Sequence, residues 1–204
     1  MNIILASASP RRHELLQLMQ LNFRVVPSEV PEPLDDNQTT SEVAEQLALL
    51  KATFVAKKFP SSLVIGADTI VEVGGKQLAK PANKQEAMAM LKGLAGTYNE
   101  VVSAAAVIRL KDNVKLVGHD VTRVYFKPYN ELQTLEYIAT GDSFDKAGGY
   151  GLQSGGAKLI DRIEGDFDTV MGLSTRLLAS FLNQCGIKCE PLSLSSPVPQ
   201  TRRS

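Results

Sequence analysis

The chain has 204 residues, of which 44% are apolar and 22% are charged, with 22 basic and 22 acidic side chains. This length fits one domain, and the apolar fraction is sufficient to bury a hydrophobic core. The formal net charge of zero argues against a protein that coats DNA or RNA, because such proteins carry a basic excess. A local basic pocket for one small anion remains compatible with this total.

The number of cysteines and the hydropathy of the chain indicate in which cellular compartment the protein is expected. Cys185 and Cys189 are the two cysteines, and this small number indicates a reducing compartment without a disulfide framework. No apolar run approaches the roughly 20 residues that a membrane-spanning helix needs. No basic region followed by an apolar stretch marks a secretory signal. We therefore expect a cytoplasmic protein with no membrane partner.

The sequence pattern of the N-terminal third predicts that strands and helices alternate. Residues 2–6 form a short continuous apolar run typical of a buried strand. A helix is expected from Pro10, with Ser9 as its N-cap, because serine at that position accepts a backbone hydrogen bond and proline fits the first turn. A second strand is expected at residues 23–27. The next helix is expected at residues 41–58, with Ser41 as its cap.

The strongest strand pattern, LVIGADTIVEV, covers residues 63–73, and the two glycines after it predict a hairpin turn. The remaining elements are expected as helices at 83–96, 130–140 and 174–186 and as strands at 100–110, 115–126 and 157–163. This alternation predicts an α/β fold with a mixed sheet. We expect one domain over residues 1–190 and a disordered, Ser/Pro-rich tail over residues 191–204.

The stretch LASASPRR, residues 5–12, places small hydroxyls and guanidinium groups where a strand gives way to a helix. A helix N-terminus presents unpaired N–H groups and a partial positive charge, which favour anions. Ser7 and Ser9 add hydroxyl donors, and Arg11 and Arg12 add forked cations suited to phosphate oxygens. The stretch therefore predicts a phosphate-binding site, with a capped helix and exposed arginines as the alternative.

Asp68 stands inside the apolar pattern of residues 63–73, where a buried carboxylate requires a partner or a metal ion. A turn at a strand end is the alternative interpretation. Glu29 and Glu32 follow the second strand, and for Glu29 a solvated loop is the preferred interpretation. Glu32 gains a role if its loop folds toward Asp68, since two carboxylates near a polyphosphate suit Mg²⁺.

Two lysines and a glycine-rich loop complete the candidates. Lys51 lies in a mostly apolar helix and Lys80 precedes a proline, and each taken alone is typical of a surface lysine. Asp145 and Lys146 precede the loop AGGYGLQSGG, residues 147–156, which contains Gln153. Glycines permit close approach of the backbone to a ligand, so this loop is a candidate for binding, with a flexible surface loop as the alternative.

Taken together, these motifs resemble the Maf family of nucleoside triphosphate pyrophosphatases. The matching segments, from residue 3 to about residue 182, are LASASPRR, SEVPE, the helix of Lys51, VIGADTIV, the Lys80-Pro81 pair and DKAGGYGLQ. The resemblance implies an α/β fold similar to the inosine triphosphate pyrophosphatases, with a mixed, twisted sheet, flanking helices and two lobes around a cleft. It also implies a homodimer.

The activity that the resemblance implies is hydrolysis of a nucleoside triphosphate to the monophosphate and pyrophosphate, with Mg²⁺ or Mn²⁺. Asp68 matches the family's proton acceptor. The phosphate-handling and metal-handling positions match Ser7, Ser9, Arg12, Lys51, Lys80 and, for the metal, Glu32 with Asp68. No nucleic acid polymer is expected as a partner.

Three positions that sort the family by base are Arg11, Thr69 and Gln153 here, and this combination resembles the branch that acts on dTTP and UTP. The chain departs from the family pattern at Asn99, Ser103, Phe144 and Ser174, which places local loop geometry in question. Two alternatives stay open: a nucleotide-binding regulator of cell division with little catalysis, and the same reaction on 7-methyl-GTP.

Overall fold

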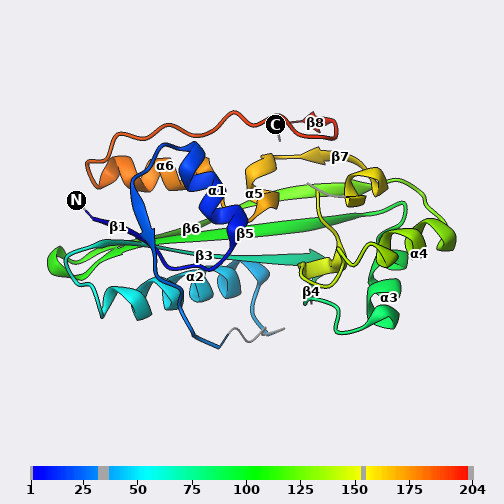
Figure 1. Cartoon of the computed structure of the whole chain (residues 1–204), viewed down its shortest axis with the longest axis horizontal. Coiled ribbons are helices and arrows are strands. Elements are labelled where there is room, and N and C mark those ends of the chain that lie inside the picture. The colour runs from blue at the N-terminus through cyan, green and yellow to red at the C-terminus, as the bar shows by residue number, and fades with distance from the viewer. Residues whose placement is uncertain (1, 32–36, 153–154, 202–204) are drawn as a thin grey trace.

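The computed structural model describes residues 2–31, 37–152 and 155–201, arranged as Figure 1 shows. Its strands are β1 (Ile3–Leu5), β2 (Phe23–Val25), β3 (Leu63–Val73), β4 (Lys76–Leu78), β5 (Tyr98–Arg109), β6 (Val114–Phe126), β7 (Ile160–Glu164) and β8 (Gln200–Thr201). Its α-helices are α1 (Pro10–Leu18), α2 (Thr40–Ala56), α3 (Lys84–Leu94), α4 (Glu131–Ala139), α5 (Phe167–Met171) and α6 (Thr175–Gln184). Short 3₁₀ turns are η1 (Leu110–Asp112), η2 (Ala147–Gly149) and η3 (Gly155–Leu159).

The strands form one sheet in the order β2-β1-β3-β5-β6-β7-β8, with β4 paired to β3. Strand β1 runs parallel to both β2 and β3, whereas β5 and β6 are antiparallel neighbours of β3 and of each other. The predicted mixed α/β sheet is therefore confirmed. Helix α2 covers one face, and α1, α5 and α6 lie over the other (Figure 1).

Both faces of β3 are buried, which explains its nearly continuous apolar sequence. Leu63, Ile65 and Val71 belong to the core under α1 and α6, while Val64 and Ile70 belong to the core under α2. Alternation of side chains along a strand sends neighbouring residues to opposite faces. The side chains of Asp68 and Thr69 consequently project from opposite faces of the same strand.

Helix α2 packs unusually close to β3 at Gly66. A Cβ atom at this glycine would overlap the Ala48 carbonyl oxygen and lie 2.7 Å from the Ala52 nitrogen. The absence of a side chain at Gly66 thus allows the backbone of α2 to approach the strand. Lys51 is on the same turns of α2, so this approach also determines how near its side chain comes to β3.

One edge of β3 opens where its neighbours end. The pairing with β1 reaches Ile65, and the pairing with β4 begins at Val71. Asp68 and Thr69 lie between these two points. The chain after β1 turns away here into the N-terminus of α1, so this stretch of β3 is bordered by a loop, and not by a paired strand, within the described residues.

Three differences between the sequence-based expectations and the structure concern a helix cap, a short helix and the tail. The N-cap of α2 is Thr39, which forms a capping box with Glu42, and not Ser41. Helix α5 was not predicted, because five residues are too short to display a helical period. The tail was expected to be disordered, but residues 191–201 follow an extended path across the α6 side to β8, where Gln200 pairs with Ile163 (Figure 1). Val198, 8% exposed, anchors this path in the core.

None of the helices within the described ranges combines the length and the apolar character that a bilayer span requires.

Candidate active site

A cavity of about 740 Å³ lies at the open edge of β3. Its walls come from the β1–α1 turn, helix α2, the loop around residues 142–152 and the end of α5. It brings together every predicted site residue that the structure describes, namely Ser7, Ser9, Arg11, Arg12, Lys51, Asp68, Thr69 and Lys80. The predicted residues Glu32 and Gln153 lie outside the described residues.

The β1–α1 turn brings hydroxyl and guanidinium groups to the wall of the cavity. Ser9 is the N-cap of α1, its side chain accepts a hydrogen bond from the Arg12 backbone N–H at 3.5 Å, and Pro10 occupies the first turn. The Ser9 N–H in turn donates to Ser7 Oγ at 3.2 Å. The helix begins here with its partial positive charge directed at the same space as Arg11, which favours an anion.

Asp68 and Lys51 form a buried ion pair at the floor of the cavity. Lys51 Nζ lies 2.5 Å from Asp68 Oδ1, and each residue is 5% exposed. Burial of a carboxylate without a partner would be costly, so the lysine explains how Asp68 is accommodated within an apolar strand. The interpretation of Lys51 as a surface lysine is wrong, whereas Lys80 is exposed at the rim.

Arg12 connects the β1–α1 turn to two distant parts of the chain at the cavity wall. Its Nε donates to the Gly172 carbonyl oxygen at 2.8 Å, Nη1 donates to Ser7 Oγ at 3.1 Å, and Nη2 donates to Thr69 Oγ1 at 3.1 Å. Residues 170–172, which end α5, also line the cavity. Sequence reasoning did not assign them a role, because no motif marks them.

The opposite wall carries a second charged cluster. Lys146 Nζ lies 2.6 Å from a carboxylate oxygen of both Asp142 and Asp145. The Tyr137 hydroxyl donates to Asp142 Oδ2 at 2.7 Å and accepts from the Gly151 N–H at 3.1 Å. This cluster fixes the start of the glycine-rich loop against α4. Asp142 was not predicted as a cavity residue. Its position, three residues before the DKAGGYG motif, is the sequence signal that could have indicated it.

Tyr150 belongs to this loop and is buried beneath the cavity. Its hydroxyl donates to Asn99 Oδ1 at 2.9 Å, and its ring meets that of Phe126 edge-on at a centroid distance of 4.9 Å. Burial raises the pKa of the Tyr150 phenol, and the hydrogen bond to Asn99 opposes the shift only in part. Asn99, one of the departures from the family pattern, therefore supports the loop from below.

A divalent cation fits this site if a phosphate-bearing ligand supplies some of the oxygen atoms that bind it. The described residues hold no cluster of three or more histidine, cysteine or carboxylate side chains that could enclose a metal ion. Mg²⁺ usually binds through one or two carboxylates together with water and the phosphates of a substrate. The buried carboxylate of Asp68, in a cavity lined by guanidinium, ammonium and hydroxyl groups, suits a cation that arrives with a phosphate-bearing ligand.

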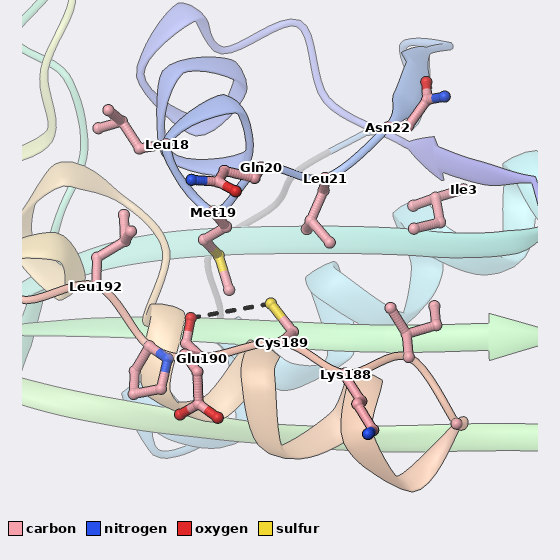
Figure 2. Close-up of a pocket in the computed structure, with 13 residues that line it drawn as sticks. Ile3, Leu18, Met19, Gln20, Leu21, Asn22, Lys188, Cys189, Glu190 and Leu192 are labelled. Atoms are coloured by element: carbon pink, nitrogen blue, oxygen red, sulfur yellow. Dashed lines mark hydrogen bonds between the residues drawn. The ribbon is translucent and has the colours of Figure 1, made fainter.

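A second cavity, of about 770 Å³, lies between the end of α1 and the segment after α6. Figure 2 shows Leu18, Met19 and Leu21 on one side, with Cys189 and Leu192 opposite. Cys189 Sγ donates a weak hydrogen bond of 3.9 Å to the Glu190 carbonyl oxygen. None of the predicted site residues lines this groove, and Lys188 is the one basic side chain among its described lining residues, so it offers no basic cluster for a phosphate.

Fold and cavity together define an α/β protein whose cavity is lined by basic side chains and has a buried carboxylate at its floor. The chain belongs to the Maf family, because the family model described as "Maf-like protein" matches residues 2–185. The predicted resemblance is therefore confirmed.

Relatives with a stated activity are similar over nearly their full length. A dTTP/UTP pyrophosphatase of Desulforamulus reducens is 45% identical over 91% of this chain and 97% of its own. A dTTP/UTP pyrophosphatase of Pelotomaculum thermopropionicum is 41% identical over 90% of this chain and 96% of its own. Among solved structures, the Staphylococcus aureus Ham1 protein matches with 18% identity and a TM-score of 0.44, over 62% of this chain and 72% of that one. A score of this size carries no argument about function.

Proposed function

We propose that this protein is a nucleoside triphosphate pyrophosphatase that hydrolyses dTTP and UTP to the monophosphate and pyrophosphate. The observation that carries the proposal is the buried Lys51–Asp68 pair at the floor of a cavity lined by Ser7, Arg12 and Lys80. The relatives named dTTP/UTP pyrophosphatase, similar over nearly their whole length, support this choice of substrate.

The triphosphate would bind with its charges toward the basic side of the cavity. Ser7, Ser9, Arg12 and Lys80 offer hydrogen-bond donors to its oxygens, and these donors offset the negative charge that develops at the α-phosphorus during the reaction. Lys51 sits beneath them and holds Asp68 in place through Oδ1. The arrangement would bring the α-phosphate near the floor of the cavity, next to Asp68.

Asp68 is the proposed general base. Its Oδ1 accepts from Lys51, and we assign proton transfer to its other oxygen. A water molecule gives a proton to Asp68 while its oxygen bonds to the α-phosphorus. The bond from that phosphorus to the bridging oxygen breaks, and the electron pair leaves with pyrophosphate. The reaction consumes one water and requires no covalent intermediate.

Mg²⁺ or Mn²⁺, bound by Asp68 and the phosphates, would neutralise phosphate charge and lower the pKa of a bound water molecule. Glu32, outside the described residues, is the second proposed ligand. Arg11 and Gln153 are the proposed base-side residues, since a glutamine amide offers both a donor and an acceptor to the edge of uracil or thymine. Thr69 occupies the third of the family positions associated with the base. A homodimer remains the expected assembly.

A nucleotide panel tests the proposal. The purified full chain is incubated with Mg²⁺ or Mn²⁺ and each of the common ribonucleoside and deoxyribonucleoside triphosphates, together with 7-methyl-GTP. Phosphate is measured with and without added inorganic pyrophosphatase, so that pyrophosphate is distinguished from orthophosphate. We expect dTTP and UTP to give the highest turnover and a signal that depends on the added enzyme.

Other results of the same panel would overturn the proposal. Tight nucleotide binding without turnover would indicate a regulator, and preferred hydrolysis of 7-methyl-GTP would indicate a different specificity. Orthophosphate released without added pyrophosphatase would indicate cleavage at the terminal phosphate.

A further inference from the structure

The Thr69 hydroxyl is fully occupied by protein groups. It lies 3.1 Å from each of Arg12 Nη2, the Gly172 carbonyl oxygen and Ser103 Oγ. A hydroxyl can donate one hydrogen bond and accept two. The carbonyl can only accept and the guanidinium can only donate, so Thr69 donates to Gly172 and accepts from Arg12. Its second acceptor position then takes the hydroxyl hydrogen of Ser103, and no capacity remains for a base edge.

The same contacts hold the guanidinium of Arg12. The Gly172 carbonyl accepts from Arg12 Nε at 2.8 Å as well as from Thr69. Ser7 receives the Nη1 donor at 3.1 Å. Because a guanidinium is planar, three hydrogen bonds from its three nitrogens to different segments fix both its position and its plane.

Gly172 can place its carbonyl at this junction because it has no side chain. Its φ is +116°, a conformation that residues with a Cβ rarely adopt. A Cβ there would make only ordinary contacts, 3.5 Å from Thr69 Oγ1 and 3.7 Å from Arg12 Nε, so the backbone conformation is what requires glycine. Ser103, fully buried on β5, supports Thr69 from the neighbouring strand, where the two residues are register partners.

We propose that Thr69, supported by Ser103 and the Gly172 carbonyl, is a positioning residue for Arg12 and thereby sets the affinity of the site for the phosphate chain. Its influence on the substrate runs through the guanidinium and is independent of the base. The inference takes the location of the phosphate site from the proposed function. It assigns Thr69 a different task from the base discrimination that the family position implied.

The test uses inorganic tripolyphosphate, a probe that has no base. Its dissociation constant is measured by calorimetry with Mg²⁺ present for the wild type and for Thr69→Val, which keeps the side-chain shape and removes the hydroxyl. We expect binding to weaken by about tenfold, the effect of losing a hydrogen bond to a charged group. Thr69→Ser, which retains the hydroxyl, should restore most of the affinity, and Ser103→Ala should weaken it in the same direction.

Thr134→Val is the matched control. Thr134 is a buried threonine of α4 outside the cavity, and its hydroxyl donates to the Asn130 carbonyl at 3.0 Å. This variant should lose stability without a change in tripolyphosphate affinity. Urea unfolding of each variant shows whether a loss of affinity comes from the site or from the fold.

Turnover separates positioning from base recognition. Thr69→Val should lower kcat/KM by the same factor for every nucleotide that the protein hydrolyses. Added to Arg12→Lys, it should cost less than the product of the two single effects, because both act on one guanidinium. A changed ratio between bases with unchanged tripolyphosphate binding would overturn the inference. The calorimetry needs no turnover, so it tests Thr69 even if dTTP and UTP are not the substrates.

Discussion

Lys51 Nζ and Asp68 Oδ1 lie 2.5 Å apart, from adjacent elements whose backbones are in close contact at Gly66. A buried lysine beside a buried carboxylate places a full positive charge under the proposed base. Because the pair is enclosed by α2 and β3, changes to either partner affect both the chemistry and the stability of the fold.

Replacing Asp68 by asparagine should remove the proton acceptor and preserve the shape. We expect kcat/KM for dTTP to fall by about 100-fold to 10,000-fold, the usual contribution of a general base. The asparagine side-chain oxygen can still accept from Lys51, so the far-ultraviolet circular dichroism spectrum should be unchanged. Steady-state kinetics with dTTP and UTP provide the measurement.

Asp112→Asn serves as the control for this change. Asp112 pairs with Arg109 at 2.7 Å on the surface and does not line the cavity. Its replacement should leave turnover at the wild-type level. If Asp68→Asn hydrolyses dTTP as fast as the wild type does, Asp68 is not the base.

Lys51→Met should destabilise the protein by about 3–5 kcal/mol, because it leaves the Asp68 carboxylate buried without its counter-charge. Lys80→Met is the comparison, since Lys80 is exposed at the rim of the same cavity. It should change the free energy of unfolding by no more than about 0.5 kcal/mol. Urea denaturation at neutral pH measures both, and equal losses would show that the buried pair contributes no more than a surface charge.

The sequence was sufficient to predict most of the sheet and those cavity residues that motifs mark, such as Ser7, Asp68 and Lys80. The strand of residues 63–73 was predicted with the observed bounds, because its apolar run is long and ends at two glycines. Ser9 and Pro10 likewise gave the start of α1. These features are local, so neighbouring residues determine them.

Most of the features that were not predicted depend on contacts between segments that are distant in the sequence. Arg12 and Gly172 are 160 positions apart, and nothing near either residue signals their hydrogen bond. The path of the tail depends on a free edge at β7 and on space in the core for Val198, neither of which composition describes. The Thr39–Glu42 capping box was visible as a local pattern, but Ser41 competed with it as an equally suitable residue type.

Gly66→Ala should be strongly destabilising although alanine normally favours ordered structure. The added methyl group would lie 2.7 Å from the Ala52 nitrogen and overlap the Ala48 carbonyl, and both are backbone atoms that cannot rotate away. Overpacking of this kind costs about 1–3 kcal/mol or more. Since α2 would be displaced from β3, Lys51 and Asp68 would separate, and turnover should fall together with stability.

Gly93→Ala is the matched control for Gly66→Ala. Gly93 lies in α3, and a Cβ there would have no neighbour within 4 Å. This substitution should stabilise the protein by about 0.5–1 kcal/mol, as expected for glycine replaced by alanine inside a helix. Thermal or urea unfolding distinguishes the opposite signs, and a neutral Gly66→Ala would show that α2 and β3 do not require close approach.

Tyr150→Phe should change how stability responds to alkaline pH. Burial raises the pKa of the Tyr150 phenol above its ordinary value of 10.0, so the folded protein keeps a proton that the unfolded chain releases. The stabilisation from this group is complete below pH 10.0 and is lost as pH rises toward the higher folded-state pKa. The wild-type free energy of unfolding should therefore fall more steeply than that of the variant as the pH rises above about 10.

The neutral-pH comparison isolates the hydrogen bond from the titration. Tyr150→Phe retains the ring packing against Phe126 but leaves Asn99 Oδ1 without the phenol, which should cost about 1–2 kcal/mol at pH 7. Burial also raises the pKa of Tyr129, but this residue is present in both proteins, so its effect cancels in the difference. Urea titrations across the pH series give the two curves. Curves that stay parallel above pH 10.0 would mean that Tyr150 ionises as readily in the folded protein as in the unfolded chain.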